Sequence, residues 1–365
     1  MSATFTTRLP ATWLSRPTAA ATASLVAVTF FIALLGIAFL PSEARRLIEP
    51  HFVSVTHCLE IGSGRSAISL FWTIPQISRQ GRQHHLAIYS PGATQPAPAF
   101  PWRDLKPQSL ANGPDADHIL VGNWDGAIYS LNVARLSDEP TCIGRQASGG
   151  VIALASSADG RFVVSQSGFG LYAWNVSTHS ERWRRDDVAP YCFALRCDSR
   201  TAIVGNLDSQ LIEIDLESGR TLKMLARFDR QILAISLSAN GSALAVLRAD
   251  GRLLLLDGHT AAPLWDAKFQ PTCLTASGRF AVFSPCGKLL VTASQDGGAT
   301  LAVWDVATGQ RLRELRGHRK VVHGAAFAAS GELRSWGADG TIRAWNLGTG
   351  AMQQVAELAP PPKAT

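Results

Sequence analysis

The sequence predicts an all-β fold of repeated four-stranded units, preceded by one membrane-spanning α-helix. Three observations carry this prediction. A strand-end pattern recurs every 40 to 48 residues, tight-turn signals recur between these strand ends, and residues 17–42 contain no charged side chain. With 365 residues, of which 46% are hydrophobic, the chain is long enough for one large repeat domain.

The apolar stretch near the N-terminus predicts a transmembrane helix over residues 19–41, between a polar segment at 1–18 and a linker at 42–50. Twenty helical residues span about 30 Å, the thickness of a hydrocarbon core. Eleven residues between Leu25 and Leu40 are Leu, Val, Ile or Phe. At about −0.45 kcal/mol each, they favour insertion by roughly 5 kcal/mol. We therefore expect a single-pass membrane protein.

The same stretch leaves cleavage and topology open. A signal peptide is the alternative, because Ser42-Glu43-Ala44 resembles a cleavage site, although signal-peptide apolar cores usually have about 7–15 residues. Two arginines precede the apolar stretch and two follow it, so the side of the membrane that holds the repeat domain is undetermined. The basic groups before the helix, which are Arg8, Arg16 and the free N-terminal amine, favour an N-terminus inside by a small margin.

A hydrophobic residue followed by Asp, Asn or Ser marks one strand end in each repeated unit. The spacing of these marks, 40 to 48 residues, is typical of a β-propeller blade. The marks are Tyr89-Ser90, Leu131-Asn132, Trp174-Asn175, Ile214-Asp215, Leu256-Asp257, Trp304-Asp305 and Trp345-Asn346.

Turn signals divide each unit into four strands. Pairs such as Asp159-Gly160, Asp250-Gly251 and Thr308-Gly309 represent three turns of the unit, and residues of this kind supply the positive φ that tight hairpins need. The apolar runs between turns, such as Leu289–Thr292, are too short for helices. Three turns and four strands per unit predict a propeller blade.

Seven such units fit a seven-bladed β-propeller over residues 51–357, followed by a flexible tail at 358–365. The unit that ends at Tyr89 is the weakest, because residues 91–101 are rich in proline. Six or eight blades are the less favoured alternatives. The segment Met352–Ala356 is expected to be the outer strand of the last blade.

The chain resembles the WD-repeat family through three residue pairs: Gly317-His318, Trp304-Asp305 and Trp345-Asn346. In that family a His, a strand Ser or Thr, a turn Asp and a strand Trp form a buried hydrogen-bonded set. The resemblance implies this structural tetrad for His318, Ser335, Asp339 and Trp345. A second unit matches in part, through Thr292, Asp296 and Trp304, but lacks Gly-His.

Basic residues recur in the connections between successive units. The resemblance places these connections on the top face of the propeller, where a ring of cations would attract an acidic or phosphorylated protein segment. The residues are Arg103, Arg145, Arg184, Arg185, Arg227, Arg230, Lys268, Arg316, Arg319 and Lys320. Solvated mixed charge is the alternative, because Asp104, Asp186, Asp187 and Asp229 share the same connections.

Residues 59–67 contain the glycine-rich sequence Gly62-Ser63-Gly64. A nucleotide-binding loop needs a helix after the glycines and an acidic residue about 20 positions further on. No acid occurs between Glu60 and Asp104, and aromatic and β-branched residues follow the glycines. A hairpin turn is therefore expected here.

The remaining motifs provide no catalytic, cofactor or metal site. The six cysteines have no zinc-binding spacing, and Cys192 and Cys197 are expected to be packing residues, or a disulfide outside the cytoplasm. The net charge of +6, without interleaved aromatic and basic residues, argues against nucleic acid.

We therefore predict a membrane-anchored WD-repeat-like propeller that acts as a protein-binding scaffold, without catalysis or cofactors. One alternative is a secreted or periplasmic propeller released from a signal peptide. Another is a propeller-type oxidoreductase or hydrolase with a site in its central channel.

Overall fold

Contacts within the computed structural model divide the chain into residues 1–50 and 51–365. The structure describes residues 52–61, 65–73, 82–89, 97–98, 105–115, 117–135, 138–268, 279–294, 298–328 and 330–357. The predicted membrane helix at 19–41 and the predicted tail at 358–365 lie outside these ranges. Among the described residues, no helix has both the length and the apolar character needed to cross a membrane.

The described residues form 28 strands, numbered in chain order. They are β1 (Phe52–Ile61), β2 (Arg65–Thr73), β3 (Arg82–Tyr89), β4 (Ala97–Pro98), β5 (Pro107–Asn112), β6 (His118–Asn123), β7 (Ala127–Asn132), β8 (Thr141–Arg145), β9 (Ala153–Ser156), β10 (Phe162–Gln166), β11 (Leu171–Asn175), β12 (Ser180–Arg185), β13 (Pro190–Leu195), β14 (Thr201–Asn206), β15 (Gln210–Asp215), β16 (Thr221–Arg227), β17 (Ile232–Leu237), β18 (Ala243–Arg248), β19 (Arg252–Asp257), β20 (Pro263–Lys268), β21 (Ala281–Phe283), β22 (Leu289–Ala293), β23 (Thr300–Asp305), β24 (Arg311–Arg316), β25 (Val322–Phe327), β26 (Leu333–Gly337), β27 (Thr341–Trp345) and β28 (Met352–Glu357).

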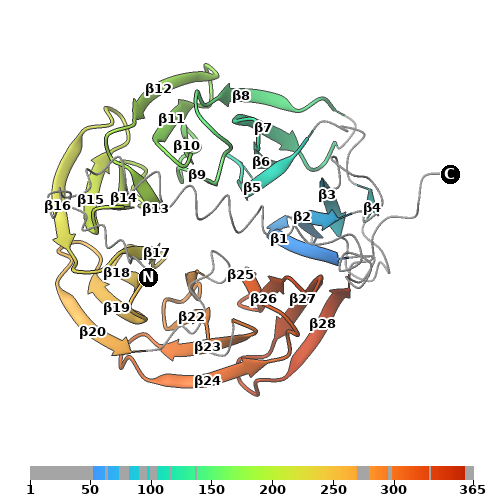
Figure 1. Cartoon of the computed structure of the whole chain (residues 1–365), viewed down its shortest axis with the longest axis vertical. Helices are drawn as coiled ribbons and strands as arrows, with labels where there is room; N and C mark the ends of the chain where they lie inside the picture. Colours follow the sequence, from blue (N-terminus) through green and yellow to red (C-terminus); the bar gives the residue numbers. More distant parts are fainter. Residues whose placement is uncertain are drawn as a thin grey trace, which may run out of the picture. The chain divides into compact units, whose positions relative to one another are not determined.

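These strands form seven antiparallel sheets of four strands, each made of consecutive strands. The sheets follow one another around a ring, and the labelled first strands, such as β1, β5 and β13, lie innermost (Figure 1). The all-β propeller class predicted from the repeat is therefore confirmed. Six sheets, from β5 to β28, are the blades whose side chains the structure describes. A seventh blade depends on the sheet β1–β4, which is described almost entirely by its backbone.

The first and last sheets meet without exchanging a strand. β1 lies against β5 of the following sheet and against β25 and β26 of the last sheet. The predicted outer strand at Met352–Ala356 is present as β28, which pairs with β27. The chain near Val53 pairs within its own sheet, with β2.

In the sheets from β5 to β28 the second strands are largely buried, because neighbouring sheets cover both of their faces. All residues of β10, β14 and β18 are buried, whereas the outer strand β12 is largely exposed. Strands covered on both faces favour continuous apolar runs over alternation. This is why the short apolar runs in the sequence correspond to second strands.

Positive-φ residues close the hairpins at the predicted turns. The first turn of five sheets contains such a residue, namely Gly160, Ser199, Gly241, Gly287 and Gly331. Ser199 has φ 57°, and a non-glycine residue tolerates this conformation only in particular settings. The turn signals read from the sequence are therefore confirmed at these positions.

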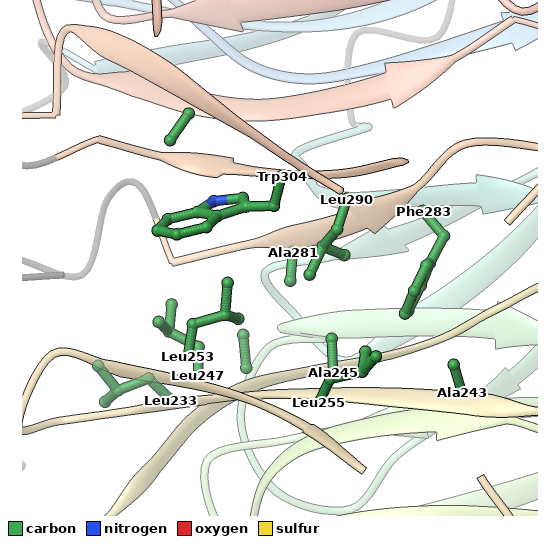
Figure 2. Close-up of a cluster of buried hydrophobic side chains, with 12 residues drawn as sticks. Leu233, Ala243, Ala245, Leu247, Leu253, Leu255, Ala281, Phe283, Leu290 and Trp304 are labelled. Atoms are coloured by element: carbon green, nitrogen blue, oxygen red, sulfur yellow. The ribbon is translucent and has the colours of Figure 1, made fainter. Parts of the chain in front are cut away.

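The hydrophobic core lies between adjacent sheets. Figure 2 shows one such layer, in which Leu253 and Leu255 of β19 face Leu290 of β22 and Trp304 of β23. Trp304 retains 4% of its surface exposed. Full burial of a large apolar side chain contributes about 1.5–3 kcal/mol. Because these side chains are buried between two sheets, each blade is stabilised mainly by packing against its neighbours.

The residues on either side of the glycine-rich sequence near the N-terminus belong to this sheet structure. β1 and β2 form an antiparallel hairpin on either side of it, with Ile61 opposite Arg65. A strand therefore begins where a nucleotide-binding loop requires a helix. The predicted hairpin is confirmed, and the fourth strand of this sheet is described as the short strand β4.

Candidate protein-binding surface

The antiparallel order of each sheet creates two distinct faces of the propeller. The top face has the turns between second and third strands and the connections from each fourth strand to the next sheet. The bottom face has the turns between first and second strands and between third and fourth strands. Partner-binding residues predicted from the sequence belong to the top face.

The predicted cations lie in the connections or at the ends of outer strands on the top face, except Arg103, which lies outside the described residues. Four of them form ion pairs: Arg145 with Asp125 at 2.8 Å, Arg184 with Asp186 at 3.0 Å, Arg185 with Asp187 at 2.6 Å and Arg316 with Glu314 at 3.0 Å. Arg227, Arg230, Lys268, Arg319 and Lys320 are exposed. Nearby carboxylates therefore balance much of the positive charge on the sheets that contain Arg145, Arg184 and Arg185.

The residues of the predicted structural tetrad are brought together in the last sheet. His318 Nε2 lies 2.8 Å from Ser335 Oγ, and Nδ1 lies 3.0 Å from Asp339 Oδ2. Trp345 Nε1 donates to Ser335 Oγ at 2.8 Å. The His318 and Asp339 side chains are 0% and 3% exposed. Because a partner has no access to them, these four residues stabilise the blade and do not form a binding surface.

Asp339 is held as a carboxylate within this network. Burial raises its pKa, but hydrogen bonds from His318, from the backbone N–H of Arg319 and from Thr341 outweigh that effect. The pKa of Asp339 therefore lies below its usual range. Through these bonds the carboxylate links Thr341 of β27 to Arg319, which lies in the segment between β24 and β25.

Two other sheets contain related networks that the sequence did not reveal in full. Trp174 Nε1 donates to Ser165 Oγ at 2.9 Å, and Ser165 Oγ donates to Gln146 Oε1 at 3.1 Å. Gln146 thus takes the place of the histidine. In the sheet β21–β24, Trp304 Nε1 donates to Thr292 Oγ1 at 3.0 Å, while Asp296 lies outside the described residues.

A row of exposed apolar side chains lies on the top face of three neighbouring sheets, and sequence analysis missed it. Trp124, Ile152, Phe169 and Leu207 are 46%, 46%, 63% and 37% exposed. Trp124, Phe169 and Leu207 each lie in a turn between a second and a third strand. We call these four residues the apolar arc.

Hydrogen bonds link the turns and connections that contain the apolar arc. The N–H of Val151 donates to the carbonyl of Asn123 at 2.9 Å, and that of Ile152 donates to the carbonyl of Gln166 at 2.8 Å. Residues 151–152 therefore bridge the turns that contain Trp124 and Phe169. Gln166 Nε2 also donates to the carbonyl of Pro190 at 3.2 Å. The preceding residue, Ala189, accepts from the N–H of Leu207 at 3.0 Å, which links the third turn.

Other exposed large hydrophobic residues lie elsewhere. Among the described residues they are confined to outer strands, at Leu222, Met224, Leu264, Leu312 and Met352. They are distributed over four sheets around the circumference. The apolar arc is thus separate from the other exposed hydrophobic residues. The leucines of the outer strands can serve as control positions when the apolar arc is substituted.

The cysteines and histidines form no chemical centre in the part of the chain that is described. No group of three or more His, Cys, Asp or Glu side chains there is arranged to hold a metal ion. Cys192 and Cys197 are both free thiols. Burial raises the pKa of Cys192 to about 12, although the residue keeps some exposed surface.

Two curated proteins are similar to parts of the chain. The nuclear distribution protein PAC1-2 of Uncinocarpus reesii is 47% identical over 62 residues, which are 17% of this chain and 13% of that protein. Apoptotic protease-activating factor 1 of Danio rerio is 26% identical over 157 residues, which are 42% of this chain and 12% of that protein. The chain thus spans a small part of each relative, and the likenesses support a WD-repeat-like propeller.

A family model matches a longer part of the chain. The match extends over residues 124–356 and includes the strands from β7 to β27. It therefore covers more than half of the sequence. On this match, the chain belongs to the PQQ_2 family, described as outer membrane protein assembly factor BamB.

Proposed function

We propose that this chain is a membrane-anchored scaffold that binds another protein through the apolar arc, without catalysis. The single observation that carries the proposal is the exposure of Trp124, Ile152, Phe169 and Leu207 in neighbouring turns and connections of the top face. Burial of a large apolar side chain contributes about 1.5–3 kcal/mol, and aromatic residues are frequent at energetically dominant positions of interfaces.

The surroundings of the apolar arc favour an apolar partner surface. The adjacent arginines Arg145, Arg184 and Arg185 are each paired with a carboxylate, so this part of the face has little net charge. The family description names an assembly factor, which is compatible with a scaffold role. An acidic or phosphorylated partner segment would engage the exposed cations of the other sheets, such as Arg230 and Lys268.

We further propose that the sheet β1–β4 closes a seven-bladed ring and that residues 19–41 anchor it in a membrane. The contacts of β1 with β5 and β25 support the first statement, and the uncharged segment supports the second. The alternative of a propeller released from a signal peptide is compatible with the family description. N-terminal sequencing separates the two, since an intact N-terminus supports the anchor and a start near Arg45 contradicts it.

Affinity capture of the tagged full chain from detergent extracts tests the scaffold. The double substitution Trp124→Ser and Phe169→Ser should reduce recovery of co-purifying proteins at least tenfold. The matched control, Leu264→Ser with Leu312→Ser, should leave recovery unchanged. Equal recovery with both variants would contradict the apolar arc. Charge reversal at Arg185, Arg230 and Arg319 measures the contribution of the cations separately.

A further inference from the structure

The sheet β13–β16 differs from the other described sheets at three positions on the bottom face, and the first of these positions is Arg196. In six sheets the residue after the first strand donates its backbone N–H to a carbonyl across the first turn, and this hydrogen bond defines equivalent positions. The equivalents of Arg196 are all small: Gly113, Ser157, Ser238, Ser284 and Ala328. Arg196 is nevertheless 6% exposed, so the sheet β13–β16 buries a cation where the other described blades place a small residue.

Glu213 is the second departure. In β15 it lies opposite Ile203 of β14, and strand register identifies its equivalents in the other described sheets. They are uncharged: Ser130, Ala173, Leu255, Val303 and Ala344. Arg196 Nε donates to Glu213 Oε1 at 2.6 Å, and Thr201 Oγ1 donates to the same oxygen at 3.3 Å.

Lys223 is the third departure and lies directly opposite Glu213 in the β15–β16 pair. Two other sheets have tryptophan at this position, Trp183 and Trp265. Trp183 covers the third turn of the following sheet so closely that a Cβ on Gly219 would come within 2.7 Å of the indole. Lys223 instead extends its Nζ to Glu213 Oε2 and to the carbonyl of His259, each at 3.3 Å.

A cavity lies at this junction of the sheets β13–β16 and β17–β20. Its volume is about 230 Å³, and its lining includes Arg196, Asp198, Glu213, Lys223, Asn240 and His259. The corresponding tryptophans in other blades fill their junctions, whereas a lysine does not. A buried ion pair is weak evidence for stability, since well-packed neutral residues often serve as well. The other blades show that the fold does not require Arg196 and Glu213.

The polar groups of the cavity have donor capacity in excess. Both oxygens of Glu213 already accept from Arg196, Thr201 or Lys223. Asp198 Oδ1 accepts from the backbone N–H groups of Arg200 and Thr201. In contrast, Nη1 of Arg196 is one of a few buried side-chain atoms in the described residues that have no hydrogen-bond partner. A ligand that supplies acceptor oxygens would match this surplus.

We propose that this cavity is a binding site for a carboxylate group, which Arg196 and Lys223 recognise. The carboxylate belongs either to an acidic side chain of a bound protein or to a small organic acid. The site lies on the face opposite the apolar arc, so it does not depend on the proposed scaffold function. The unpartnered guanidinium nitrogen of Arg196 and a pre-existing polar cavity give the site a charged hydrogen-bond donor and a defined shape.

Calorimetric titration of the full-length protein tests the proposal with three probes: succinate, an N-acetylated Asp-Glu dipeptide amide, and neutral succinamide. At least one acid should bind, and succinamide should not. Binding of succinate indicates a small acid, and binding of the dipeptide alone indicates an acidic side chain. Lys223→Trp, which fills the junction as in the neighbouring blades, should weaken binding at least tenfold. Arg313→Trp, at the equivalent position of β24, should leave it unchanged.

A repeat-restoring variant, Arg196→Ser with Glu213→Leu and Lys223→Trp, addresses the ion pair without leaving an unpaired charge. It should fold and lose binding at least tenfold. Bound acid should also slow alkylation of Cys197 in the cavity lining, while the exposed Cys142 and Cys286 react as before. Absence of binding by both acids, or equal binding by the repeat-restoring variant, would overturn the proposal.

Discussion

Removing the hydroxyl of Ser335 should strongly destabilise the last blade. Ser335 is fully buried, and its Oγ lies 2.8 Å from both His318 Nε2 and Trp345 Nε1. Ser335→Ala leaves these two buried nitrogens without that partner. A buried polar group that loses its hydrogen bond costs about 1–3 kcal/mol, so the two together should lower the free energy of unfolding by about 2–6 kcal/mol.

Urea unfolding of the purified chain, followed by tryptophan fluorescence, measures this effect. The transition midpoint should fall while the slope with urea stays unchanged. Ser330→Ala is the control, because Ser330 is exposed in a bottom-face turn, and substitutions at such sites usually change stability by less than about 0.5 kcal/mol. If Ser335→Ala changes stability no more than this control, the tetrad does not stabilise the blade as argued.

Three further predictions concern charge and thiol reactivity. The pKa of Asp339 in the folded protein lies below its ordinary value of 3.8. The ionised carboxylate therefore contributes fully to stability above about pH 4, and this contribution is lost as the pH falls. The difference in melting temperature between wild type and Asp339→Asn should shrink from pH 7 to pH 3. Glu213→Leu leaves Arg196 buried without its partner and should cost about 3–5 kcal/mol in urea unfolding, most of which Arg196→Ser in the same chain should restore. Cys192, with its pKa near 12, should resist iodoacetamide at pH 8 while Cys197 reacts, as followed by mass spectrometry.

The repeat could be predicted from the sequence because its signals are local. A turn such as Asp159-Gly160 needs a positive-φ residue at a fixed place, and a second strand such as β14 contains a short buried apolar run, at residues 202–204. The first sheet was less predictable, because a short outer strand in proline-rich sequence leaves little pattern. Its described part, Ala97–Pro98, has only two residues.

The binding surfaces were less predictable because they depend on which turns become neighbours. Trp124 and Phe169 are separated in sequence but join through residues 151–152. Likewise, the positions of the arginines in the sequence predicted a ring of cations but could not show which carboxylates lie close to them. In the structure, Arg145 and Arg185 are paired with carboxylates. The departures at Arg196, Glu213 and Lys223 became visible only when strand register aligned equivalent positions.

Site-specific photo-crosslinking in intact cells tests the scaffold role of the apolar arc most directly. A benzophenone amino acid at Phe169 or Leu207 should give a discrete crosslinked protein species. The same group at Leu264 or Leu312, which are comparably exposed on outer strands, should not give that species. No crosslink from the apolar arc, or the same species from all four positions, would contradict protein binding through this surface.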